Sequence, residues 1–164
     1  KVLSERRRIR LEEHIKRDAL AWGIGWASVE EIDAINILRA SLLAMSRACR
    51  SMKIVPSKVM VDGLHVPPDI PCTAEAVVNG DSLIPAISAA SILAKNARDR
   101  VMLDIHRQHP EYGFDRHKGY PTKSHLEAIQ RLGILPVHRR SFAPVRRLCA
   151  VVEAVSHGAD GGSR

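Results

Sequence analysis

The chain has 164 residues, of which 45% are hydrophobic and 4% aromatic, with a formal net charge of +7 and a pI of about 9.8. This size and composition favour one folded domain with an aliphatic core, and they exclude an intrinsically disordered chain. The positive charge favours polyanionic partners, with nucleic acid ahead of an acidic membrane surface.

Hydrophobic periodicity and turn residues predict helices that alternate with strands. Ser4 is the expected N-cap of the first helix, and Pro85 suits the first turn of the third helix. In chain order we expect a helix at 4–18, a strand at 20–28, a helix at 29–52, strands at 58–62 and 73–78, a helix at 83–108, an irregular loop at 111–122, a helix from 123 that stops at Gly133, and a helix at 142–155. This alternation is typical of an α/β layer architecture.

The predicted sheet is thin, with three strands for five helices, and the chain begins at Lys1 rather than at Met. We therefore expect that the first strands of the sheet are missing from this chain. The three cysteines, Cys49, Cys72 and Cys149, include no C-x-x-C pair, so neither a disulfide framework nor a zinc site is expected. No apolar run approaches the ~18 residues of a membrane span, and these features together predict a cytoplasmic protein without a membrane partner.

The strand at 58–62 ends on a carboxylate, Asp62, which Gly63 follows. One interpretation is turn chemistry, because Asp-Gly commonly opens a tight turn. The other is that the end of a rigid strand holds Asp62 as a ligand for a divalent cation, since magnesium and manganese prefer carboxylate oxygens. Asp81, which follows Gly80 in a turn, is a weaker candidate for the same site.

On the predicted helix 83–108, Lys95 and Asp99 fall toward the packed half, where polar side chains need partners. Two interpretations stay open. The two residues stand four positions apart and can form an ion pair with each other. Alternatively, Asp99 converges with Asp62 on a metal ion, because ligands from two different elements are typical of such sites.

Two basic segments are candidate nucleic-acid contacts. In "HKGYPT", Tyr120 can stack on a sugar or base and Lys118 can meet a phosphate, although an ordinary turn with Thr122 as N-cap explains the same residues. In "HRRSF", an anion can bind near the start of the last helix, although a solvated basic face is an equal alternative. The candidate anion-binding residues there are Arg139, Arg140 and Ser141.

Several segments, taken together and in this order, resemble ribonuclease HII, the bacterial type 2 ribonuclease H. They are "KVLSERRR", "EIDAINILRASLLAM", "VMVDGL", "AVVNGDSLIPAISAASILAKNARDR", "YGFDRHKGYPT" and "HRRSFAPV". The resemblance implies a ribonuclease H-like α/β fold with extra C-terminal helices. It places an incomplete catalytic domain at 1–148 and a helix end with a flexible tail at 149–164.

The resemblance also implies an endonuclease that hydrolyses the RNA strand of RNA–DNA hybrids and incises 5′ of single ribonucleotides in duplex DNA. Asp62 and Asp99 match two of the four carboxylates with which the family holds Mn²⁺ or Mg²⁺. Tyr120 matches the tyrosine that senses the ribose 2′-OH, the group that distinguishes RNA from DNA. Substrate contacts are expected from Lys118, Lys95, Arg139, Arg140 and Ser141, and the complete protein is expected to be a monomer.

The family's other two carboxylates belong to a D-E-x-G-R-G motif that lies upstream of the "KVLSERRR" match and does not occur in this sequence. In addition, Leu64 and Asn79 stand where the family usually has asparagine and lysine. We therefore expect this chain alone to bind metal poorly and to be weak or inactive. The alternatives are a non-catalytic, basic nucleic-acid-binding remnant and a structural interaction domain.

Overall fold

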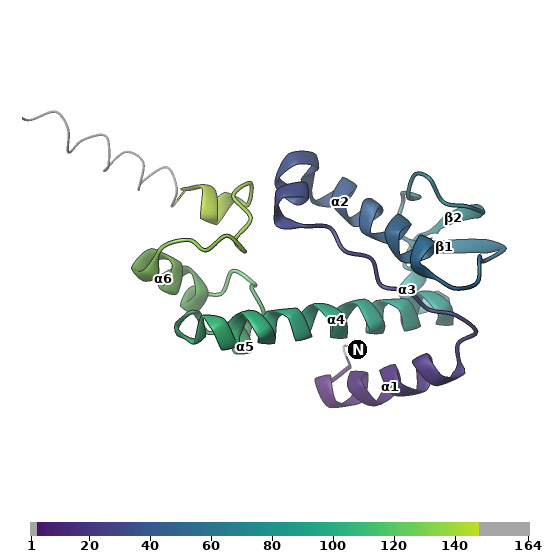
Figure 1. Cartoon of the computed structure of the whole chain (residues 1–164), viewed down its shortest axis with the longest axis horizontal. Coiled ribbons are helices and arrows are strands. Elements are labelled where there is room, and N and C mark those ends of the chain that lie inside the picture. The colour runs from purple at the N-terminus through teal and green to yellow at the C-terminus, as the bar shows by residue number, and fades with distance from the viewer. Residues whose placement is uncertain (1–2, 148–164) are drawn as a thin grey trace, which may run out of the picture. The chain divides into compact units, whose positions relative to one another are not determined.

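The computed structural model describes residues 3–147 (Figure 1). Its elements are α1 (Glu5–Asp18), α2 (Val29–Ser51), β1 (Lys58–Asp62), β2 (Thr73–Val77), α3 (Gly80–Leu83), α4 (Pro85–Gln108), the 3-10 helix η1 (Pro110–Tyr112), α5 (Phe114–His117) and α6 (Lys123–Leu132). They divide between two compact units. Unit 1 holds Lys1–Ala27 and Ile37–Arg100, and unit 2 holds Ser28–Asn36 and Val101–Arg164.

Unit 1 contains the sheet, in which β1 and β2 pair in parallel from Lys58 opposite Thr73 to Asp62 opposite Val77. The pairing continues past β1, because the Gly63 N–H donates to the Val77 carbonyl at 2.9 Å. Parallel strands end at the same edge of a sheet, so the residues that follow β1 and β2 lie together. This edge carries Asp62, and α3 begins beside it.

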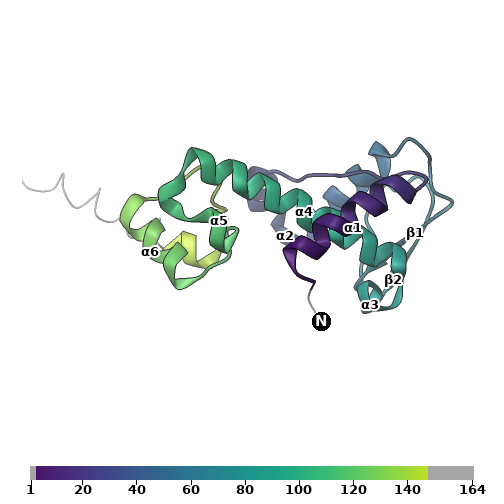
Figure 2. The ribbon, with the colours of Figure 1, turned by 90° about the horizontal axis from the view of Figure 1, so that it is seen from below.

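Helix α1 runs beside the first half of α4, as Figures 1 and 2 show. Ser4 is confirmed as the N-cap of α1, since its hydroxyl accepts from the Arg7 N–H at 3.4 Å. The contact between the two helices includes buried polar groups. Glu12 of α1 is 5% exposed and accepts from Arg100 and Asn96 of α4, with each donor–acceptor distance at 2.8 Å. Paired polar groups therefore hold α1 in place.

The predicted strand at 20–28 is wrong, because the described residues show no regular structure there. Its glycines instead lie against the backbone of α2. A Cβ atom added at Gly25 would come within 2.0 Å of the Ala44 carbonyl oxygen, and one at Gly23 within 2.5 Å of that of Ala48. The alternation of large and small residues thus reflects close packing on a helix and not a pleated strand.

Other boundaries differ by local detail. The predicted helix 29–52 is interrupted at Asn36, where φ is 69° and ψ is 165°, a backbone region that residues other than glycine rarely adopt. Pro85 does open the long helix α4, but the separate turn α3 precedes it. The loop predicted at 111–122 includes the short helices η1 and α5. Residues 143–147 are helical, and the rest of the predicted last helix and tail lies outside the described residues.

Unit 2 has its own hydrophobic core. Phe114, 1% exposed, stacks on Tyr112 with ring centroids 5.6 Å apart. The other buried members of this core are Ala128, Ile129 and Val145. None of the helices within residues 3–147 combines the length and apolar character that crossing a bilayer requires.

Candidate active site

Asp62 stands exposed at the end of β1. Its Oδ1 accepts the backbone N–H of Gly80 at 2.8 Å, which ties the strand end to the start of α3. Gly80 is buried, and a Cβ atom there would lie 2.6 Å from the Ile87 side chain and 3.3 Å from that of Val77. A glycine at this position therefore lets α3 approach the sheet edge closely.

This contact brings a second carboxylate to the edge. Asp81 follows Gly80 directly, is exposed, and accepts from the Ser82 hydroxyl at 3.3 Å. By sequence, Asp81 is a weaker candidate ligand than Asp99. The signal that favours Asp81 is its place just after β2, since two adjacent parallel strands end at one edge. Asp62 and Asp81 supply the hard oxygen ligands that divalent cations prefer.

Asp99 has a different environment. It is 6% exposed, and both carboxylate oxygens already have cationic partners. Arg8 of α1 donates to Oδ2 at 2.9 Å, and Lys95 donates to Oδ1 at 2.6 Å. The i,i+4 ion pair between Lys95 and Asp99, one of the two interpretations of the sequence, is thus confirmed. With Arg8 it forms a link between α1 and α4.

The described residues offer only part of a metal site. Among residues 3–147, no group of three or more His, Cys, Asp and Glu side chains gathers as a complete ligand set would. Asp62 and Asp81 fit Mn²⁺ or Mg²⁺ by chemistry but not by number, because such ions take six or more oxygen ligands, with water supplying several of them.

In unit 2, the segment "HKGYPT" forms a tight loop between α5 and α6. Lys118 and Gly119 both have positive φ, 48° and 78°. The Lys118 ammonium donates to the Asp115 carbonyl at 2.7 Å, and the side chain of Tyr120 is 54% exposed. Thr122 is confirmed as the N-cap of α6, accepting from the His125 N–H at 3.3 Å. The loop therefore combines the predicted cap with an accessible aromatic ring.

In "HRRSF", the anion that binds is a carboxylate of the protein itself, that of Asp33. The backbone N–H groups of Arg140 and Ser141 donate to the carboxylate of Asp33 at 2.8 and 2.9 Å, and the Ser141 hydroxyl donates to it at 2.5 Å. Burial raises the pKa of Asp33, but these hydrogen bonds outweigh burial and leave the pKa below its ordinary value. The guanidinium of Arg139 lies over the Phe142 ring at 5.2 Å. The sequence does not predict this contact, because Asp33 lies 107 residues from Arg140.

Comparison with known proteins agrees with this description. A family model described as "Ribonuclease HII" matches residues 1–145. A "Ribonuclease HII" of Marinomonas sp. (strain MWYL1) is 57% identical over 148 residues, which cover 90% of this chain and 74% of that relative. One of Nitrosomonas europaea is 59% identical over 145 residues, 88% of this chain and 66% of the relative.

Among solved structures, the crystal structure of the ribonuclease H2 from Pyrococcus horikoshii OT3 has a TM-score of 0.76 at 23% identity, and the match covers 92% of this chain and 79% of that one. This likeness confirms the predicted ribonuclease H-like α/β fold, of which the described residues contain two strands. Both the family model and the close relatives give the same assignment. The chain belongs to the ribonuclease HII family.

Proposed function

We propose that this chain is the ribonuclease H part of an endonuclease that hydrolyses the RNA strand of RNA–DNA hybrids and incises 5′ of single ribonucleotides in duplex DNA. Family membership over residues 1–145 supports the reaction class. The observation that carries the proposal is the exposed Asp62 at the carboxyl end of β1, tied to α3 through Gly80. The net charge of +7 suits a polyanionic substrate.

We propose Asp62 and Asp81 as ligands for Mn²⁺ or Mg²⁺. When bound, such an ion activates water and stabilises the leaving oxygen in phosphodiester hydrolysis. The role of Asp99 as a metal ligand stays a prediction, and its pairing with Arg8 and Lys95 favours a second role, that of holding α1 on α4.

The proposed substrate contacts lie in unit 2, except for Lys95, which belongs to unit 1. Tyr120 presents an exposed ring that can meet the ribose carrying the 2′-OH. Lys118 and Lys95 are proposed phosphate contacts, as are the guanidinium groups of Arg139 and Arg140. Ser141 is hydrogen-bonded to Asp33 and thereby fixes the backbone that carries Arg139 and Arg140. Its proposed contribution to substrate binding is this positioning. The domain boundary proposed from the sequence, 1–148 with a tail at 149–164, stands as part of this proposal.

The chain alone is proposed to be weak or inactive, because its described residues bring too few ligands together. Removing electrostatic stabilisers of a transition state typically costs two to three orders of magnitude each. The second candidate function is non-catalytic binding of nucleic acid, which the net positive charge favours.

The test combines metal binding with cleavage. The chain and the variants D62N, D81N and D99N are titrated with Mn²⁺ by electron paramagnetic resonance, and their melting temperatures are recorded. They are then incubated with Mn²⁺ and a DNA duplex that carries one ribonucleotide. We expect D62N and D81N to weaken Mn²⁺ binding at unchanged melting temperature, and D99N to lower the melting temperature.

The outcomes distinguish the candidate metal ligands and the two candidate functions. Unchanged Mn²⁺ binding in both D62N and D81N would contradict the proposed site. Weaker binding in D99N at an unchanged melting temperature would instead restore Asp99 as a ligand. Binding of the duplex with no cleavage at any Mn²⁺ concentration, together with no Mn²⁺ binding, would favour the non-catalytic candidate.

A further inference from the structure

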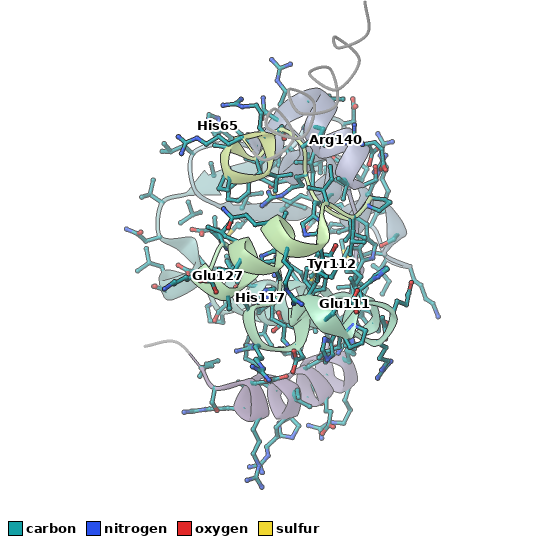
Figure 3. The ribbon with its side chains drawn as sticks, turned by 90° about the vertical axis from the view of Figure 1, so that its left-hand side faces the viewer. His65, Glu111, Tyr112, His117, Glu127 and Arg140 are labelled. Atoms are coloured by element: carbon teal, nitrogen blue, oxygen red, sulfur yellow. The ribbon has the colours of Figure 1, made fainter. Side chains whose placement is uncertain are left out.

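Three histidines are buried together in unit 2. His117, His125 and His138 are 5–7% exposed. The rings of His117 and His125 stack at 4.1 Å between centroids, and the Nε2 atoms of His125 and His138 lie 3.3 Å apart. Figure 3 labels His117 and its hydrogen-bond partner Tyr112, close to α6, from which His125 projects. We call these three side chains the histidine network.

The partners of the network determine where its protons lie. The Nδ1 of His125 is 2.9 Å from the carbonyl oxygen of Tyr120, which can only accept, so this nitrogen carries the proton and Nε2 does not. The Nδ1 of His138 accepts from the Leu135 N–H at 2.8 Å, so the proton of His138 is on Nε2. His138 therefore donates to His125, and His125 donates to Tyr120.

His117 follows the same logic. Its Nδ1 accepts from the Gly119 N–H at 3.2 Å, and its Nε2 donates to the Tyr112 carbonyl at 2.8 Å. Every ring nitrogen of the network thus has one partner, and each ring is a defined neutral tautomer. Protonation of His125 would place its new Nε2–H against the Nε2–H of His138 across 3.3 Å. The added proton would find no hydrogen-bond acceptor there, so this arrangement disfavours the charged form.

The network ends on the loop that presents Tyr120. The Tyr120 carbonyl accepts from His125 and from the Thr122 N–H, and its own N–H donates to the His117 carbonyl at 2.8 Å. Lys118, two residues before Tyr120, has a φ of 48°, a left-handed conformation that non-glycine residues adopt infrequently. Buried histidines therefore hold the backbone from which an exposed ring projects.

We infer that His125 and His138 are positioning residues that set the orientation of Tyr120 for a duplex containing a ribonucleotide, and that they do so only while both are neutral. The inference rests on the proposed role of Tyr120. It uses neither Asp62 nor Asp81. The histidine network then contributes to recognition of the substrate and takes no part in the reaction at the phosphodiester.

The surroundings favour the neutral form. Burial lowers the pKa of His125 to about 4, and burial also lowers the pKa of His138. His109 packs on Tyr112, whose ring lies 5.7 Å from that of His138. His117 reaches a cavity of about 420 Å³ whose charged or titratable lining residues are His106, Glu111, Asp115, Arg116, Glu127 and Arg131. The acids there line the side of His117, and none of them bonds to His125 or His138.

The first experiment tests the geometry without any substrate. Long-range ¹H–¹⁵N correlation spectra of the chain at pH 7.5 are expected to show a proton on Nδ1 of His125 and on Nε2 of His117 and His138, and the pattern of His125 is expected to persist down to about pH 5. The variant H125A is expected to shift the backbone resonances of Lys118, Gly119 and Tyr120, and H125N to restore them, since its amide can donate to the Tyr120 carbonyl. The exposed His14 supplies the control H14A, which should leave this loop unchanged.

The second experiment measures affinity for a DNA duplex with one ribonucleotide and for the same duplex without it. H125A and Y120A are expected to lose roughly tenfold in affinity for the first duplex only, which is the scale of one hydrogen bond, while H125N and H14A keep the preference. At pH values below about 5, the wild-type preference for the duplex with the ribonucleotide should decrease. The ratio of the two affinities of Y120A should not change with pH.

Different failures have different meanings. Other tautomers, or unchanged Tyr120 resonances in H125A, would overturn the inference whatever the binding data. A preference that Y120A loses and a folded H125A retains would also overturn it. If Y120A keeps the preference while H125A moves the loop, the proposed function of Tyr120 is wrong, and the recognition role of the histidines falls with it although their geometry stands.

Discussion

The carboxylate of Glu12 shows how paired donors stabilise a single buried charge. Arg100 donates to both of its oxygens at 2.8 Å, and Asn96 and Lys16 add one contact each. The hydrogen bonds from Arg100 hold the pKa of Glu12 at about 2, although burial opposes them. Arg8 and Lys95 form ion pairs with the carboxylate of Asp99. The interface of α1 with α4 thus contains two buried carboxylates, each paired with cationic side chains.

We predict that E12Q loses about 2–4 kcal/mol of unfolding free energy, because the cations that face Glu12 would keep their charge and lose their partner. The exposed neighbour Glu13 gives the matched control E13Q, for which we expect a change below about 0.5 kcal/mol. Urea denaturation at pH 7 measures both. Equal effects of the two substitutions would show that the buried cluster contributes nothing specific to stability.

Among the elements, the segment at 20–28 departs most from its prediction. Leu20 is 93% exposed, while Gly23 and Gly25 lie on the backbone of α2. We predict that G25A costs more than about 3 kcal/mol, since its Cβ would overlap a backbone carbonyl that cannot rotate away. L20A in the same segment should cost less than about 0.5 kcal/mol. Thermal unfolding of both variants checks this, and a mild effect of G25A would mean that the segment does not pack on α2.

The same elements show what sequence alone can predict. Local signals were sufficient where partners are near in sequence: the caps Ser4 and Thr122 and the Lys95–Asp99 pair are confirmed. Contacts between segments that are distant in the sequence could not be predicted. The anchoring of the 140–141 turn by Asp33 spans more than 100 residues, and no periodicity reports it. The contact of Asp62 with Gly80 likewise depends on the register of the sheet, and the sequence alone does not show that this contact lies one residue from Asp81.

At the scale of the whole molecule, the two units respond to acid through different groups. In unit 2 the pKa of His125 falls from 6.5 to about 4 on folding. The unfolded state then binds more protons than the folded state between these values, so stability falls as the pH falls from 6.5 to about 4, by roughly 3 kcal/mol. In unit 1 the pKa of Glu12 falls from 4.5 to about 2, so the corresponding loss occurs only between these lower values.

We therefore predict that unit 2 loses its structure at a higher pH than unit 1. The composition supplies separate optical probes, because both tryptophans, Trp22 and Trp26, belong to unit 1 and both tyrosines, Tyr112 and Tyr120, to unit 2. In an acid titration, the near-ultraviolet tyrosine signal should change between about pH 5 and 4, and the tryptophan emission should change below about pH 4. H125N should shift the tyrosine transition to lower pH and leave the tryptophan transition in place. Coincident transitions in the wild-type chain would mean that the two units unfold as one, and that the histidine network does not set the acid stability of its own unit.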